Sequence, residues 1–214
     1  MKRLPALAVA LCALAPAPAL AQGVGRFPPD RQLVTRYDAT TTEAACVLRR
    51  NHDQSVALVV AADDRPIIGK LDAALTNCVK GFSLTMNVRE LKVIMADLLL
   101  HENGGALLKR AAALPAAQPV RVTVAGDWPG EQVFGCVAAA QPARAAAMMS
   151  EARATPAEGA AFRALIPTLQ GCVPSDGALS IKPGEVRGLL AVALYRRLNE
   201  YRSAGDGAKG GTGQ

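Results

Sequence analysis

Four cysteines carry the most distinctive chemistry of this chain: Cys46, Cys78, Cys136 and Cys172. A cysteine can form a disulfide, ligate a metal or act as a nucleophile, and its neighbours distinguish these roles. The chain contains no C-x-x-C motif, and no cysteine has a histidine at the spacing of a zinc site. We therefore interpret the four cysteines as structural disulfides and expect neither a metal nor a cofactor.

The pairing of these cysteines has three solutions. Sequence alone leaves all three open, but the cysteines lie two by two in a pair of similar segments. If one segment once folded alone, its only bridge was internal. This reasoning favours Cys46–Cys78 and Cys136–Cys172.

Acid–base chemistry has few candidates. His52 and His101 are the only histidines, and neither recurs in the other segment. The carboxylates that do recur, Glu90 and Glu185, fall in the first turn of predicted helices, where capping is the usual role. We therefore predict no catalytic residue within the repeated framework.

An enzyme remains the alternative hypothesis. Its site would have to lie in the part of the chain that is not repeated, around His101-Glu102 or Asp127-Trp128. Convergence of these titratable groups in one cleft is the observation that would support it.

The cysteines are positioned by an internal repeat. Cys46-Val47 recurs as Cys136-Val137, and the pattern Leu-x-x-x-Leu-x-x-Cys-Val at 71–79 recurs at 165–173. The repeated positions are apolar, capping or cysteine residues, which is what packing requires. We predict a mainly α fold of two tandem pseudo-symmetric helical repeats, each with a disulfide, plus short β segments. The expected divisions are a signal peptide at 1–21, a first repeat at 22–101, a linker at 102–133, a second repeat at 134–202, and a disordered Gly-rich tail at 203–214.

The N-terminus has the features of a secretory signal peptide. A basic start at Lys2 and Arg3 precedes an apolar Ala/Leu-rich stretch that includes a fifth cysteine, Cys12. The small-x-small sequence ending at Ala21 suits a signal peptidase, and the apolar stretch is too short to span a membrane. We predict an exported protein, periplasmic or secreted, with no transmembrane segment after cleavage. Cleavage would remove Cys12 and leave four cysteines, an even number that fits two disulfides in an oxidising compartment.

Several helix boundaries follow from local signals. Thr40-x-x-Glu43 resembles a capping box at the start of a helix that carries Cys46. A helix break is predicted at Asn51, and at the corresponding Gln141-Pro142, because proline belongs in a first turn. The spacing i, i+3, i+4, i+7 predicts helices over 71–78 and 165–172, with each cysteine on the apolar stripe.

The later part of each repeat should contain a short strand and a closing helix. Alternating residues predict strands at 83–86 and 178–181. The closing helices begin at the capping box Asn87-x-x-Glu90 and at Pro183. Within the linker we expect a break at 103–105, a short helix at 107–114, a strand at 120–124 and a turn at 127–130.

The final motifs resemble those of one group of proteins. The patterns Leu-x-x-x-Leu-x-x-Cys-Val-Pro at 165–174 and Arg-Gly-x-Leu-Ala-x-Ala-Leu-Tyr at 187–195 resemble uncharacterised secreted helical-repeat proteins of alphaproteobacteria with duplicated cysteines. The first repeat departs from the pattern at Lys80 and Leu100. The resemblance implies a fold and no activity.

Composition narrows the function further. Removal of Lys2 and Arg3 with the leader lowers the formal net charge from +6 to +4, and aromatic residues make up 4% of the chain. So few aromatics do not supply the stacking platforms of a single-strand nucleic-acid binder. We expect no nucleic-acid partner. The predicted function is a non-catalytic periplasmic binding or interaction module for an unknown envelope protein or ligand; a small envelope enzyme and a holdase-type chaperone are the alternatives.

Overall fold

The fold was analysed in a computed structural model, which describes residues 36–78, 87–122, 129–173 and 183–209. These residues form eight helices and no strand. The mainly α prediction is therefore correct for the described residues. The helices are α1 (Arg36–Arg50), α2 (His52–Val60), α3 (Arg65–Cys78), α4 (Val88–Ala112), α5 (Pro129–Ala140), α6 (Pro142–Ser150), α7 (Pro156–Cys172) and α8 (Pro183–Lys209).

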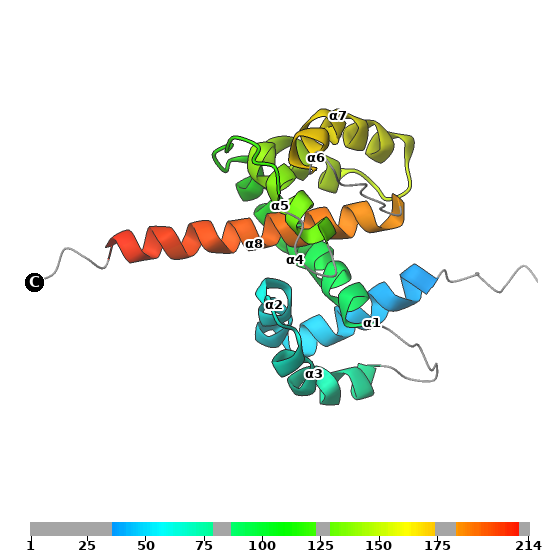
Figure 1. Cartoon of the computed structure of the whole chain (residues 1–214). Coiled ribbons are helices and arrows are strands. Elements are labelled where there is room, and N and C mark those ends of the chain that lie inside the picture. The colour runs from blue at the N-terminus through cyan, green and yellow to red at the C-terminus, as the bar shows by residue number, and fades with distance from the viewer. Residues whose placement is uncertain (1–35, 79–86, 123–128, 174–182, 210–214) are drawn as a thin grey trace, which may run out of the picture. The chain divides into compact units, whose positions relative to one another are not determined.

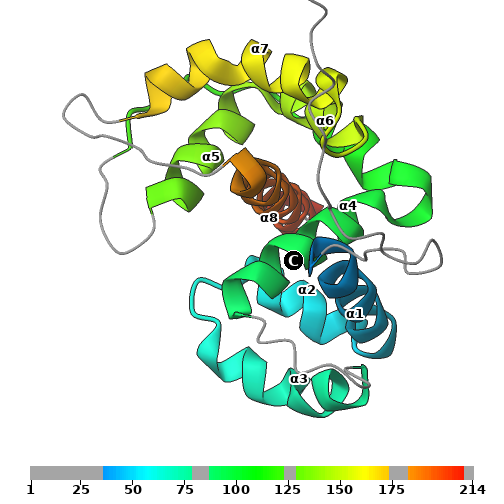
Figure 2. The same cartoon turned by 90° about the vertical axis from the view of Figure 1, so that its right-hand side faces the viewer.

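Helices α4 and α8 cross each other and lie between two groups of three helices (Figure 1). Helices α1, α2 and α3 contact one another, and α1 and α2 also contact α4. Helices α5, α6 and α7 form the second group, in which α5 and α6 contact α8. Each group also contacts the other central helix: α6 contacts α4, and α2 contacts α8. Figure 2, seen along α8, shows the two groups on opposite sides of this helix.

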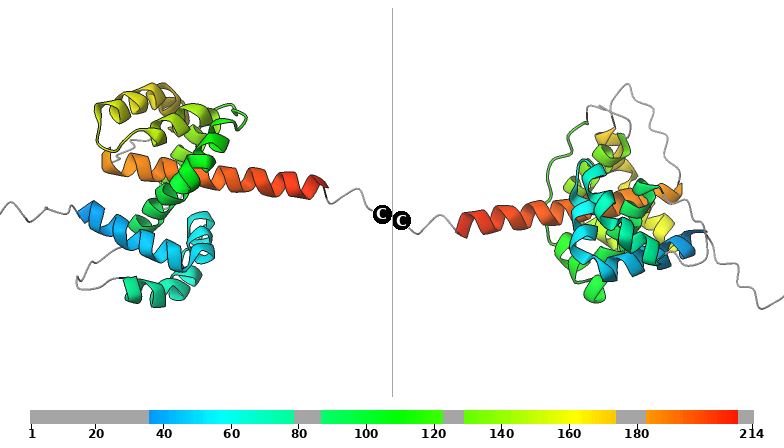
Figure 3. Two further views of the ribbon diagram at one scale, coloured as in Figure 1. Left: turned by 180° about the vertical axis from the view of Figure 1, so that it is seen from behind. Right: turned by 90° about the horizontal axis from the view of Figure 1, so that it is seen from below.

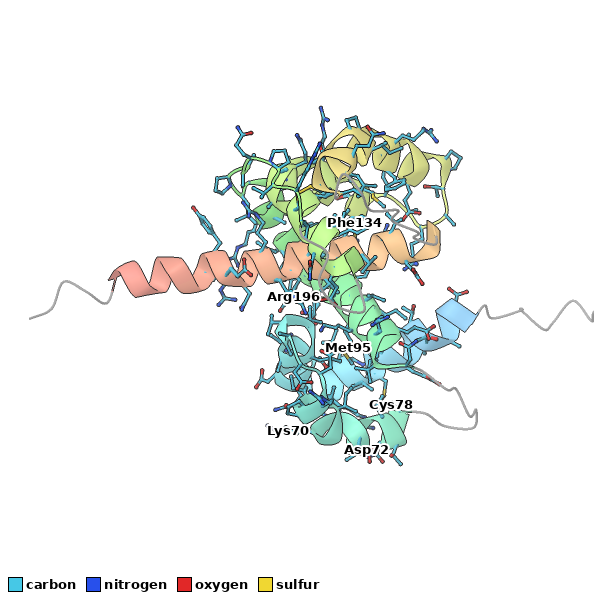
Figure 4. The ribbon with its side chains drawn as sticks, in the orientation of Figure 1. Lys70, Asp72, Cys78, Met95, Phe134 and Arg196 are labelled. Atoms are coloured by element: carbon cyan, nitrogen blue, oxygen red, sulfur yellow. A yellow bond between two sulfur atoms is a disulfide. The ribbon has the colours of Figure 1, made fainter. Side chains whose placement is uncertain are left out.

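One continuous apolar core runs through both groups. The apolar stripe of α4 contributes Leu91, Ile94 and Met95, each at most 2% exposed. Its counterpart on α8 is buried as well, and Figure 4 labels Met95 and Phe134 in this core. The methionines at 148 and 149 are also buried, so their role is packing. Burial of these stripes supplies the main drive for folding.

The predicted helix breaks at Asn51 and Gln141 are confirmed. Their backbone angles are nearly the same, φ −140° and ψ 59° at Asn51, and φ −135° and ψ 57° at Gln141. The capping box at the start of α4 is also confirmed, because the Asn87 side chain accepts a hydrogen bond of 2.7 Å from the backbone N–H of Glu90. Local signals thus define these helix boundaries well.

The break predicted at 103–105 divides α4. Asn103, Gly104 and Gly105 have φ of 52°, 67° and 74°, and Glu102 is extended. Glycine adopts positive φ without the steric penalty of a side chain, so this sequence interrupts the helical path and lets it resume. The second segment of α4 ends at Ala112, close to the predicted end.

Other boundary predictions need correction. Thr40 does not cap a helix, since α1 begins at Arg36 and buries Thr40 completely. The first part of the strand predicted at 120–124 is irregular, and its Val122 N–H bonds to the Cys172 carbonyl instead of to a neighbouring strand. A strand needs a partner edge, which alternation in one segment cannot supply. The strands predicted at 83–86 and 178–181, and residues 123–124, lie outside the described residues.

Two further segments differ from expectation. Pro129 and Gly130 of the turn predicted at 127–130 form the first turn of α5, where proline is favoured. Helix α8 continues to Lys209, so the tail expected to be disordered from Ser203 begins inside this helix. Helix propagation costs little once the preceding turns are fixed by packing. Figure 3 shows this end of α8 extending past the other helices.

Each group of three helices is joined by one disulfide. Cys46–Cys78 links α1 to α3, and Cys136–Cys172 links α5 to α7. These are the pairs favoured by the sequence. The bridges close loops of 32 and 36 residues, for which chain entropy predicts a stabilisation of about 3.5 to 4 kcal/mol each.

The crossing of α4 and α8 depends on Gly188. A Cβ atom at this position would lie 2.6 Å from the Cβ of Val93, closer than two carbon atoms can approach. The glycine therefore sets how near the two helices come.

We predict that Gly188→Ala destabilises the protein by about 1 to 3 kcal/mol, because the added methyl group forces the helices apart. Urea unfolding followed by circular dichroism measures the change. The matched control is Gly135→Ala in α5, where a Cβ meets nothing within 4 Å. This control should gain up to about 1 kcal/mol from helix propensity. Equal effects of the two substitutions would contradict close packing at the crossing.

Candidate functional site

Charged side chains are buried on α4 and α8, the two helices that lie between the groups. Among the described residues, Lys92, Asp97 and Arg187 are at most 8% exposed. Burying an ionised group is costly unless it is paired and hydrogen-bonded. The partners of these three residues therefore define the candidate site.

Arg187 on α8 is the centre of the first group of charges. Its Nε donates to Asp97 Oδ2 at 3.1 Å, and its Nη1 donates to Glu158 Oε1 at 3.0 Å. Nη1 and Nη2 also donate to the carbonyls of Glu151 and Met149, at 2.9 and 2.8 Å. Burial opposes the charge, but the two carboxylates outweigh it and raise the pKa of Arg187. The guanidinium thereby joins α8 to α4, to α7 and to the end of α6.

Asp97 on α4 lies between two arginines and a histidine. Arg187 and Arg153 approach its Oδ2, Arg153 at 3.5 Å, while Oδ1 lies 3.3 Å from Nδ1 of His101. Burial alone would raise the pKa of Asp97, but the His101 ring and the Arg187 guanidinium prevail and hold it below its ordinary value. The carboxylate is therefore ionised over the neutral range.

His101 is the last member of this set of charged residues and lies one turn after Asp97 on α4. Its Nδ1 lies 2.7 Å from the Asp97 carbonyl oxygen, and its Nε2 lies 2.9 Å from the Met149 carbonyl oxygen. The interaction with the Asp97 carboxylate raises the pKa of His101, against the opposing effect of partial burial. We call these residues the Arg187 cluster: Asp97, His101, Arg153, Glu158 and Arg187.

A second group of charges surrounds Lys92. Its Nζ donates to Asp64 Oδ1 at 2.6 Å and to the Ala61 carbonyl at 2.8 Å, and Glu131 Oε1 lies 3.9 Å away. Arg196 on α8 donates to Glu131 Oε2 at 2.6 Å and to the Val59 and Ala61 carbonyls. Figure 4 labels Arg196 on α8. We call this the Lys92 cluster: Asp64, Lys92, Glu131 and Arg196.

The two clusters have the same construction. In each cluster a buried cation binds one carboxylate and one carbonyl. Lys92 on α4 binds Asp64, which follows α2, and the Ala61 carbonyl at the end of α2. Arg187 on α8 binds Glu158, which follows α6, and the Glu151 carbonyl at the end of α6. Each cluster also has a second basic residue at the last turn of a helix. Arg196 on α8 contacts the Val59 carbonyl of α2, and His101 on α4 contacts the Met149 carbonyl of α6. The bridging carboxylate differs, Glu131 from α5 in one and Asp97 from α4 in the other.

This arrangement fixes helices rather than exposing reactive atoms. The cations bind the free carbonyls at the ends of α2 and α6, where the helix dipole favours positive charge. No cluster of three or more metal-ligating side chains occurs in the parts of the chain that the structure describes. Both clusters hold the ends of helices through charged hydrogen bonds.

Of the residues proposed for an enzyme, His101 and Glu102 do not converge. His101 binds Asp97 and Met149, whereas Glu102 points to His52, with 3.2 Å between Glu102 Oε2 and His52 Nε2. This pair of His52 and Glu102 is not evident from the sequence, in which the two residues are 50 positions apart. Asp127 and Trp128 lie outside the described residues.

The remaining sequence candidates lie in the first turns of helices, as predicted. Glu90 lies in the first turn of α4 and its N–H is capped by Asn87, as expected. Glu185 lies in the first turn of α8 and is exposed. Sequence reasoning missed both charge clusters, although a signal existed: Lys92 and Asp97 interrupt an otherwise apolar stretch at 91–100. A buried charge in such a stretch indicates a partner elsewhere in the fold.

A groove of about 520 Å³ lies beside the Arg187 cluster, between the bend of α4 and α6. Its walls are mostly apolar and small, and His101 lies at its edge. The groove residues are His101, Gly104, Gly105, Leu108, Lys109, Ala112, Ala143, Ala146, Ala147 and Ser150.

Two further findings concern membrane-spanning helices and similarity to known proteins. None of the helices in the described ranges is both long enough and apolar enough to cross a membrane. No protein-family model, curated protein or solved structure matches the chain.

We predict that Arg187→Leu destabilises the protein by about 3 to 5 kcal/mol, because two buried carboxylates and two carbonyls lose their common donor. Urea unfolding monitored by circular dichroism measures the loss. The matched control is Arg163→Leu on the exposed side of α7, with an expected change within about 0.5 kcal/mol. A loss below about 1 kcal/mol for Arg187→Leu would show that the cluster does not hold the helices together.

Proposed function

We propose that this protein is an exported, non-catalytic interaction module built from a tandem duplication. In this proposal the copies are residues 22–101 and 134–202, and 1–21 is a leader removed on export. The observation that carries the proposal is the pair of charge clusters, in which the groups best suited to chemistry are used to join the two copies.

The clusters support the duplication because their members occupy corresponding positions. Lys92 matches Arg187, and Asp64 matches Glu158, when the chain is aligned on its cysteine segments. The carbonyl acceptors correspond in the same way, Ala61 with Glu151. Unrelated segments would have no reason to repeat a buried interaction at aligned positions.

The helix crossing supports a two-fold relation between the copies. Val93 and Gly188 are corresponding positions, and they face each other at the closest approach of α4 and α8. Equivalent residues meet each other only at a two-fold axis, as in isologous dimers. The copies therefore resemble the two subunits of a symmetric dimer joined into one chain.

Export is supported by the two disulfides, because such bonds persist in oxidising compartments and are rare in the cytosol. A covalently fixed scaffold also suits a module that works outside the cell membrane, where no ATP-driven chaperone can refold it. The resemblance to secreted alphaproteobacterial proteins points in the same direction.

The contact surface of the module is proposed near two exposed apolar residues. Val120 is 70% exposed and Tyr201 is 58% exposed, whereas the other large apolar side chains of the described residues are more covered. Tyr201 lies on the part of α8 that extends past the other helices (Figure 3). A tyrosine on a rigid helix is a typical anchor for a protein partner.

We predict that the tagged full chain, expressed in a Gram-negative host, is recovered from the periplasmic fraction with Gln22 at its N-terminus. Mass spectrometry of non-reduced peptides should show the 46–78 and 136–172 bridges and no free thiol. A chain retained in the cytosol with reduced cysteines would overturn export, without touching the role of the charge clusters.

The interaction role is tested separately by site-specific photocrosslinking in the periplasm. A photoreactive residue at Tyr201 or Val120 should give one discrete adduct that mass spectrometry identifies, and the same residue at exposed Arg163 on α7 should give none. An equal distribution of adducts over all three positions would contradict a defined contact surface.

A further inference from the structure

His101 has both ring nitrogens directed at acceptors. Nδ1 lies 2.7 Å from the Asp97 carbonyl oxygen and Nε2 lies 2.9 Å from the Met149 carbonyl oxygen. A carbonyl oxygen accepts hydrogen bonds and cannot donate one. Both contacts are therefore satisfied only if both nitrogens carry a proton.

A neutral imidazole carries one N–H and leaves a lone pair on the other nitrogen. In this site the lone pair would face a carbonyl oxygen, so one of the two contacts would become repulsive. Since the Asp97 contact is local to α4, the Met149 contact across to α6 is the one that separation of the helices can relieve. The geometry thus ties the α4–α6 contact to the charge of His101.

The corresponding contact in the Lys92 cluster has no such dependence. There Arg196 donates to the Val59 carbonyl at 3.0 Å and to the Ala61 carbonyl at 2.7 Å. A guanidinium keeps its charge at any physiological pH. The Arg196 contact is therefore permanent, whereas the His101 contact can be switched while the Arg187 bonds to the same end of α6 stay in place.

The charges around His101 favour its protonated form only in part, since both signs are present. On α4, Asp97 is adjacent and Glu102 and Lys109 lie further along the helix. From the packed elements come Arg153 after α6, Glu158 on α7 and Arg187 on α8. Arg187 and Arg153 are neutralised by Asp97 and Glu158, which leaves the His101 ring beside a carboxylate and two carbonyls.

We propose that His101 is a pH-operated latch: its imidazolium adds a bond between α4 and the end of α6, which Arg187 also binds, and its deprotonation removes that bond and loosens the groove between the α4 bend and α6. The groove walls beside the latch are Gly104, Gly105 and Leu108 on α4 and Ala146, Ala147 and Ser150 on α6. Small residues on both sides give the released helix end room to move. This latch requires neither export nor duplication, so it stands apart from the proposed function.

The direction of the effect follows from linkage. The pKa of folded His101 is raised above its ordinary value of 6.5 by the Asp97 side chain, against partial burial. The latch is therefore fully engaged below about pH 6.5, and it is lost as the pH rises through the higher pKa of the folded state. The contact between α4 and the end of α6 should therefore be more stable in mildly acidic medium than in alkaline medium.

Two measurements on the intact, oxidised protein test the latch. The first is the NMR titration of the His101 Cε1–Hε1 signal, assigned by its absence in His101→Gln, which should give a pKa above 6.5. The second is hydrogen exchange by mass spectrometry of peptides covering 143–152 from pH 6 to 8.5, corrected for the intrinsic exchange rate at each pH. Protection of these peptides in the wild type should fall at least about fivefold as the pH rises through this range.

Three variants make the test specific. His101→Arg places a permanent cation there, as Arg196 does in the other cluster, and should keep protection constant over the pH range. His101→Gln should be weakly protected at every pH, while His52→Gln, which removes the other histidine, should titrate like the wild type. A His101 pKa at or below 6.5, or the same pH profile in the wild type and His101→Arg, would overturn the proposal. The wild-type titration decides the matter even if a variant fails to fold.

Discussion

The fold depends on neutralising the positive charge that is buried on α4 and α8, between its two groups of helices. Lys92 and Arg187 are almost fully buried, and a buried cation destabilises a protein unless carboxylates and carbonyls surround it. Arg187 on α8 binds Asp97 on α4 as well as groups on α6 and α7. Lys92 on α4 binds Asp64 and lies 3.9 Å from Glu131 on α5. Moving the groups apart would expose carbonyls at the ends of α2 and α6 and leave carboxylates without cations. Electrostatics therefore sets the relative position of elements that apolar packing alone would leave free to slide.

Three kinds of interaction stabilise the arrangement of the helices. The disulfides Cys46–Cys78 and Cys136–Cys172 hold each group of three helices together. The close crossing at Gly188 allows α4 and α8 to share one core. The charge clusters then fix the orientation around that crossing. Of these, only the His101 contact responds to pH in the neutral range, which makes one side of the junction adjustable and leaves the other permanent.

Local sequence signals predicted the helices well and the site poorly. Asn51, Pro142 and Asn87 mark helix boundaries through their own backbone preferences, and the cysteines lie on stripes that periodicity reveals. The strand predicted at 120–124 was wrong over 120–122, because alternation does not show whether a partner strand exists. The clusters escaped prediction because Arg187 and Asp97 meet only after α4 and α8 cross. Lys92 and Asp97 in an apolar stretch signalled a buried charge, but their partners depend on tertiary structure.

The central claim is that the buried charges couple both groups of helices into one cooperative unit. Native-state hydrogen exchange in increasing urea tests it most directly, by comparing the slowest amides of α1 with those of α7. The account predicts that both helices reach the same opening free energy and the same dependence on urea, because both open only by global unfolding. A lower opening free energy for one group, with the other still protected, would contradict it.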